Sequence, residues 1–71
     1  MEPTLEQYQQ LYISCSTITR QLKWHIRWVE QVPGGEIVLI AQPPNANPNE
    51  RRRIIVTIQV NGRVSYGGTG L

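Results

Sequence analysis

The stretch YQQLYISCSTITRQLKWHIRWVEQV, residues 8–32, decides how the rest of this 71-residue chain folds. It holds both tryptophans, the single cysteine and the single histidine. It contains no Gly, Pro, Asn or Asp, so nothing in it signals a reversal of the backbone. The remainder of the chain is rich in these residues and is predicted to form strands and turns that pack against this stretch.

The apolar pattern of this stretch fits two secondary structures. As a helix, it has an apolar stripe at intervals of three and four residues, formed by Leu11, Cys15, Ile18, Leu22, Ile26 and Val29. As a strand, it alternates Leu22, Trp24, Ile26 and Trp28 with Lys23, His25 and Arg27. The helical match is longer, whereas the strand match has the better local propensity, so both interpretations stay open. In either structure Lys23 and Arg27 point away from the apolar side chains.

The residues before the tryptophans predict a first helix over residues 4–12. Thr4 is a candidate N-cap, with Gln7 completing a capping box, and apolar side chains recur at helical spacing in Leu5, Tyr8, Leu11 and Tyr12. Residues 13–19, ISCSTIT, disfavour a helix because Ser and Thr compete for backbone hydrogen bonds. Either a turn falls here, with Ser14 or Ser16 capping a second helix, or the chain becomes extended.

The second half of the chain predicts strands. Pro33, Gly34 and Gly35 end the opening stretch, and residues 36–42, EIVLIAQ, have the length and β-branched content of a buried strand. A proline-rich loop at 43–50 precedes a second strand at 51–60. Asn61-Gly62 predicts a two-residue type I′ turn that leads to a short third strand at 63–66, and residues 67–71 are predicted to be a flexible tail.

The predicted fold class is therefore α+β in one small domain, residues 1–71. An N-terminal helical segment is followed by an antiparallel β-hairpin or three-stranded meander. A chain this short buries only about 60% of the surface that its unfolded form exposes, so self-association into a dimer is a reasonable expectation.

Net charge and targeting signals narrow the functional classes. The formal charge is +2, and six of the seven basic residues form two clusters: Arg20, Lys23 and Arg27, and Arg51, Arg52 and Arg53. Such clusters bind nucleic acid or acidic proteins, or simply keep a small domain soluble. The acidic, polar N-terminus is no signal peptide and no apolar run is long enough for a bilayer, so a cytoplasmic protein without membrane contact is expected.

Residues 4–23, TLEQYQQLYISCSTITRQLK, carry a similarity to known proteins. They resemble the helix-turn-helix of small bacterial and phage regulators, whose second helix is commonly written S-T-V-x-R-x-L. Leu5 and Leu11 match the first helix, and the second is matched by Ser16, Thr17, Ile18, Arg20 and Leu22. Tyr8, Tyr12 and Gln21 depart from the small, glycine and apolar residues usual at those positions.

The resemblance implies a small, non-enzymatic protein that binds double-stranded DNA, of the regulator or recombination accessory type. Its second helix would enter the major groove, with Cys15, Ser16, Thr17 and Arg20 nearest the bases. Lys23 and Arg27 would lie on the same exposed face. The hairpin would act as a winged-helix wing, with Arg51, Arg52 and Arg53 on the DNA backbone.

The alternative is a protein–protein interaction module, subunit or adaptor with no role in nucleic-acid binding. In that case residues 13–32 are partly strand, and Trp24 and Trp28 form the surface for a homodimer or another partner. The secondary structure of residues 14–31 separates the two interpretations. Catalysis, a metal site and a cofactor are not expected, because His25 has no partner ligand nearby in sequence and no nucleophile–base set is visible.

Overall fold

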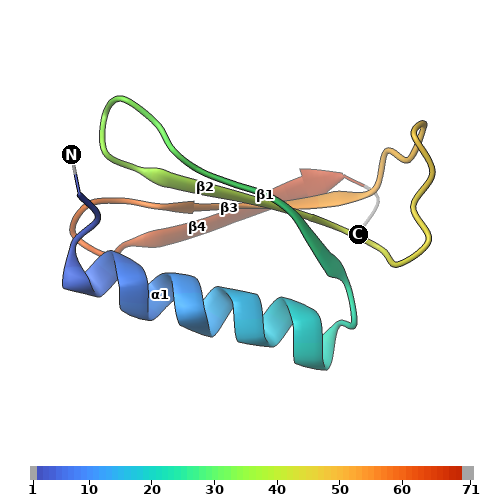
Figure 1. The fold of residues 1–71 in the computed structure, drawn as a ribbon, viewed down its shortest axis with the longest axis horizontal. Coiled ribbons are helices and arrows are strands. Elements are labelled where there is room, and N and C mark those ends of the chain that lie inside the picture. The colour runs from blue at the N-terminus through green and yellow to red at the C-terminus, as the bar shows by residue number, and fades with distance from the viewer. Residues whose placement is uncertain (1, 70–71) are drawn as a thin grey trace.

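The computed structural model describes residues 2–69 as one helical segment packed on one face of a four-stranded antiparallel sheet (Figure 1). The helical segment consists of α1, Leu5–Ser16, and a continuing π-helical turn η1, Thr17–Gln21. The strands are β1, His25–Gln31, β2, Ile37–Gln42, β3, Arg53–Ile58, and β4, Val64–Thr69. Their order in the sheet is β1-β2-β3-β4. The predicted α+β class is confirmed, with one strand more than the predicted meander.

Helix α1 begins as predicted but ends later. The Thr4 side chain accepts a hydrogen bond from the Gln7 N–H, and the Gln7 side chain accepts one from the Thr4 N–H, which completes the capping box. The predicted end at residue 12 is wrong, because the helix runs unbroken through the Ser- and Thr-rich tract. The Thr19 hydroxyl donates to the Cys15 carbonyl oxygen at 2.8 Å, so this side chain bonds inside the helical segment rather than ending it.

The helical segment ends in a left-handed residue, and the chain then enters β1. Lys23 has φ +62°, the left-handed conformation with which helices commonly end. The Trp24 N–H reaches back to the Ile18 carbonyl oxygen at 3.1 Å, one residue further than in the usual closing bond of an α-helix. Each interpretation of residues 8–32 is therefore right for one part. Residues up to Gln21 are helical, and residues 25–31 form a strand, so the predicted helical stripe over residues 22–29 is wrong.

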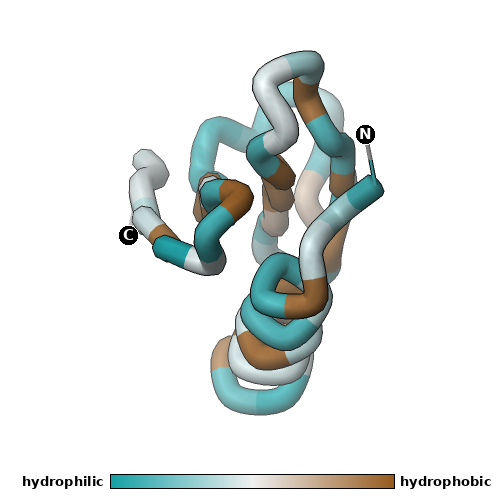
Figure 2. Tube along the Cα trace, turned by 90° about the vertical axis from the view of Figure 1, so that its left-hand side faces the viewer, coloured by the Kyte–Doolittle hydropathy of each residue, from teal (hydrophilic) through white to brown (hydrophobic). Residues whose placement is uncertain are grey.

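Alternation along the two central strands builds the core. Ile37, Leu39 and Ala41 of β2 face the helix, and Ile54, Val56 and Ile58 of β3 lie opposite them. All six are at most 7% exposed, and Ile18 from η1 completes the buried set. Figure 2, which looks along the helix, shows that the helix lies on one side of the sheet. The other side of the sheet is its open face.

Gln7 bonds the start of the helix to two separate parts of the sheet, the β1–β2 turn and the end of β3. Its side chain is completely buried, and its Nε2 donates to the Gly35 carbonyl oxygen at 2.8 Å and to the Ile58 carbonyl oxygen at 3.1 Å. The Thr4 hydroxyl adds a bond to the Val60 carbonyl oxygen at 2.8 Å. One polar residue thus positions α1 against both the β1–β2 turn and the end of β3.

The β3–β4 hairpin is confirmed, but its predicted turn is wrong. The Gly62 N–H bonds to the Gln59 carbonyl oxygen, and the Gln59 N–H bonds to the Arg63 carbonyl oxygen, so the loop holds three residues rather than two. Within this loop only Gly62 has positive φ, at +88°, as in the common three-residue hairpin loops. The Asn61 Oδ1 instead accepts from the Arg63 N–H at 3.0 Å.

The predicted tail at 67–71 is wrong for residues 67–69, which belong to β4. Gly67 and Gly68 pair with Ile55 and Ile54, so glycines that suggested disorder lie in the sheet. A Cβ at position 68 would overlap the Arg53 carbonyl oxygen, which explains why this position in the strand is a glycine. Residues 70 and 71 lie outside the described residues.

Candidate binding surfaces

The residues matched to a helix-turn-helix do not form two helices joined by a turn. Ser16 ends α1, and Thr17 and Arg20 lie in the π-helical turn that continues it. Thr17 and Arg20 are exposed and Ser16 is half-buried. The β2–β3 hairpin is likewise the centre of the sheet, flanked by β1 and β4, rather than a protruding wing. The expected recognition geometry is therefore absent from the described residues.

The structure instead gathers both basic clusters in one half of the molecule. The end of the helical segment, the start of β1 and the start of β3 all lie at the same end of the sheet (Figure 1). We define the basic half by Arg20, Lys23, Arg27, Arg51, Arg52 and Arg53, with Glu50. The acidic half contains Glu2, Glu6, Glu30 and Glu36, with Arg63. The formal charges are +5 and −3, which together give the net +2 of the chain.

The three consecutive arginines have different surroundings. The Arg52 Nε and Nη2 donate to the Glu50 carboxylate at 3.0 and 3.1 Å. These hydrogen bonds lower the pKa of Glu50 to about 2. Arg53 begins β3 on the open face, opposite Thr69, and the Arg51 carbonyl oxygen accepts from the Thr69 hydroxyl. All three side chains are exposed.

Lys23 and Arg27 line a shallow hollow at the start of β1, together with Thr19, Trp24, His25 and Ile26. Trp24 is half-buried and packs against the core, which removes it from the predicted partner surface. Arg27 falls at a shift in register between β1 and β2, where the strand bulges. The hollow thus has two cationic side chains and the Trp24 side chain in its lining.

Trp28 lies on the open face of the sheet and begins an apolar row. It stands opposite Ile40 of β2, which stands opposite Ile55 of β3, which stands opposite Gly67 of β4. Trp28 is 56% exposed, and its Nε1 is 3.4 Å from the Glu30 carboxylate.

Polar rows border this apolar row on both sides. The row toward the acidic end runs through Glu30, Val38, Thr57 and Ser65. The row on the other side contains His25, Gln42, Arg53 and Thr69.

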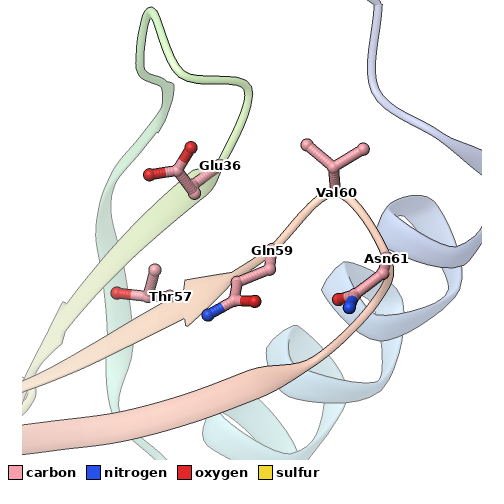
Figure 3. A pocket seen from close by; sticks show the side chains of 5 residues that line it. All are labelled: Glu36, Thr57, Gln59, Val60 and Asn61. Carbon is pink, nitrogen blue, oxygen red and sulfur yellow. The ribbon is translucent and has the colours of Figure 1, made fainter.

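A hollow at the acidic end of the sheet is drawn in Figure 3. Glu36 comes from just before β2, Thr57 from β3, and Gln59, Val60 and Asn61 from the chain that leads to the β3–β4 loop. One carboxylate and two amides give it a polar lining. It forms a polar border to the apolar row rather than an enclosed pocket.

Two further surfaces were not predicted from the sequence. The outer side of α1 exposes Leu5, Tyr8, Tyr12 and Ile13, each at least half exposed, because the helix buries Gln7 and Ser14 instead. The second surface is a groove of about 460 Å³ between the helical segment and β4, lined by Ser14, Thr17, Ile18, Leu22, Ile54, Tyr66, Gly67 and Gly68.

Among residues 2–69 no three His, Cys, Asp or Glu side chains lie close enough to hold a metal ion. Burial raises the pKa of the Cys15 thiol, which packs against the core. No helix in this part of the chain has the length and apolar character to cross a bilayer.

No family model, no curated protein and no solved structure matches this chain.

Proposed function

We propose that this protein is a non-enzymatic module that binds a protein partner on the open face of its sheet. The observation that carries the proposal is the row Trp28–Ile40–Ile55, an apolar centre bordered by polar rows on both sides. Protein interfaces have this arrangement, with an apolar, aromatic centre and a polar rim. Tryptophan is also the residue type most enriched among those that dominate binding energy.

The separation of charge between the basic half and the acidic half would set the orientation in which a partner binds this surface. The open face ends in His25 and Arg53 on the basic side and in Glu30 and Glu36 on the acidic side. A partner with the opposite division of charge is attracted in one orientation and repelled in the other. The long proline-rich loop at 43–52 lies at the basic end of the sheet (Figure 1).

Replacing Trp28 with Ala tests the proposal. Because this side chain is 56% exposed, the variant is expected to keep its melting temperature within a few degrees. A partner recovered with the full chain and then purified is expected to bind the variant about 30-fold more weakly, the loss typical of a central interface tryptophan. Titration calorimetry of the purified pair measures this loss.

Tyr12→Ala is the matched control, because Tyr12 is an equally large exposed aromatic on the opposite side of the molecule. This variant should bind the partner as tightly as the unchanged chain. Equal weakening by both variants, or a Trp28→Ala protein that unfolds, would refute the open face as the binding surface.

A second candidate function is sequence-independent binding to double-stranded DNA, favoured by the +5 charge of the basic half. With no recognition helix, Arg20, Lys23 and Arg27 would contact phosphates together with the three consecutive arginines. Ser16 and Thr17 would have no base to read. Binding of this type is dominated by the release of counterions from the nucleic acid.

Replacing Arg51, Arg52 and Arg53 together with Ala tests this candidate. Affinity for mixed-sequence duplex DNA should fall, and the slope of log K against log salt concentration should flatten by up to about 0.9 for each phosphate that the variant no longer neutralises. Fluorescence anisotropy at several salt concentrations measures the slope. If the unchanged chain shows no salt-dependent binding, the nucleic-acid function is excluded.

A further inference from the structure

The two edges of the sheet differ in how they are protected against pairing with another strand. β1 carries a bulge at Arg27 and the charged residues Arg27 and Glu30, features that discourage edge-to-edge contact. β4, with the sequence VSYGGT, has no charged residue and pairs with β3 without a shift in register. β4 is therefore the edge that is open to strand addition.

The hydrogen bonds of the hairpin show which groups of β4 point outward. The Gln59 N–H bonds to the Arg63 carbonyl oxygen at 2.8 Å, so Arg63 faces its partner strand. In an antiparallel pair, inward- and outward-facing residues alternate. Val64, Tyr66 and Gly68 therefore direct their N–H and C=O groups away from β3, toward the free edge.

The groove between the helical segment and β4 lies beside the same edge. Its lining is mostly apolar, with Ile18, Leu22 and Ile54, and the two glycines of β4 contribute no side chain. The Ser14 residue is 2% exposed, and its Oγ has no hydrogen-bond partner among the described residues. A buried hydroxyl without a partner is costly, so an incoming polar group would be stabilised there.

We propose that β4 pairs with β4 of a second copy of this chain, antiparallel and centred on Tyr66. In this register Tyr66 stands opposite Tyr66 of the second copy, and Val64 stands opposite Gly68. The Val64 side chain of one copy then lies opposite Gly68 of the other copy, which has no side chain to obstruct it. The side chains of Val64 and Tyr66 point to the helix side of the sheet, because they pair with the core residues Ile58 and Val56. In the proposed dimer these side chains therefore enter the groove of the neighbouring copy.

The charges of the two halves favour a second copy in this orientation. Antiparallel pairing places the basic half of one copy beside the acidic half of the other, whereas parallel pairing would place like charges together. The contact is also self-complementary about a two-fold axis, so it closes at two copies rather than growing into a filament. The result is one continuous eight-stranded sheet with both helical segments on the same face and both open faces on the other.

Paired substitutions at Tyr66 test both the surface and the register. The unchanged chain is expected to sediment as a dimer that dissociates on dilution. Because Tyr66 faces itself, Tyr66→Lys and Tyr66→Glu each place like charges opposite one another, and each should weaken the dimer at least about tenfold. An equimolar mixture of the two variants should restore the dimer, because opposite charges then face across the axis. Val29→Lys, at a 47% exposed position on the other edge strand, is the matched control and should dimerise normally.

Amide hydrogen exchange supplies a second measurement that needs no substitution. The N–H groups of Val64, Tyr66 and Gly68 should become more protected as the protein concentration rises, while outward N–H groups of β1 should not. A chain that stays monomeric at all concentrations overturns the proposal. So does a dimer that both Tyr66 variants leave intact, since it would use another surface such as the open face or the outer side of α1. Failure of the Tyr66 mixture to dimerise overturns the register.

Discussion

Replacing Gln7 with Ala is expected to lower the free energy of unfolding by about 3 kcal/mol. The side chain is completely buried, and its Nε2 is the donor to the carbonyl oxygens of Gly35 and Ile58. Without it, the Ile58 carbonyl oxygen loses this donor and the Gly35 carbonyl oxygen keeps only the longer bond from the Gln31 Nε2, at 3.2 Å. A buried polar group that loses its hydrogen bond costs about 1–3 kcal/mol. The capping bond to the Thr4 N–H is removed as well. Chemical denaturation followed by circular dichroism measures the change.

Gln9→Ala is the control for this prediction. Gln9 lies two residues further along the same helix and is exposed, so its replacement should change stability by less than about 0.5 kcal/mol. A Gln7→Ala protein as stable as the Gln9→Ala protein would show that the helix is held to the sheet by apolar contacts alone.

Replacing Gly62 with Val is expected to destabilise the fold by about 2–3 kcal/mol. The residue has φ +88°, a conformation that a β-branched side chain adopts only with strain. A Cβ at this position would also lie 2.9 Å from the Glu6 Cβ, so the loop would push against the first turn of α1. Thermal unfolding should show a clear drop in melting temperature.

Asn61→Val separates the observed loop from a two-residue type I′ turn. In the three-residue loop Asn61 does not need positive φ, and its replacement removes only the exposed bond to the Arg63 N–H. The expected cost is therefore about 1 kcal/mol or less. If Asn61→Val were as damaging as Gly62→Val, both positions would have to adopt positive φ, contrary to the structure.

Local signals predicted those parts of the fold in which neighbouring residues decide the outcome. The capping box of Thr4 and Gln7, the strand at 36–42 and the β3–β4 hairpin were all readable from short patterns. The sequence did not show which face of the helix is buried. Tyr8 and Tyr12 have the spacing and size of core residues, yet the side chains that fit against the sheet are Gln7, Ser14 and Ile18. That choice depends on the carbonyl groups of Gly35 and Ile58, which are far from Gln7 in the sequence.

The same distinction between local and long-range information applies to the candidate surfaces. Sequence identified the basic residues and Trp28, but it could not place both basic clusters in one half of the molecule, because this needs the pairing of β1, β2 and β3. The helix-turn-helix expectation failed at the Ser- and Thr-rich tract, where tertiary packing of Ile18 outweighs weak helix propensity. Gly67 and Gly68 were assigned to a tail because glycine disfavours strands. The β4 edge and its groove were therefore not visible in the sequence.

The meander order of the strands has a consequence for how quickly the chain folds. Each strand pairs only with its neighbours in the sequence, so the sheet can form hairpin by hairpin without closing a large loop. The long-range hydrogen bonds at the start of α1 are different, since Gln7 reaches Gly35 and Ile58 across 28 and 51 residues. Closing such loops costs entropy before any hydrogen bond can form. We therefore expect docking of the helix to follow formation of the sheet, so that Gln7→Ala speeds unfolding far more than it slows folding.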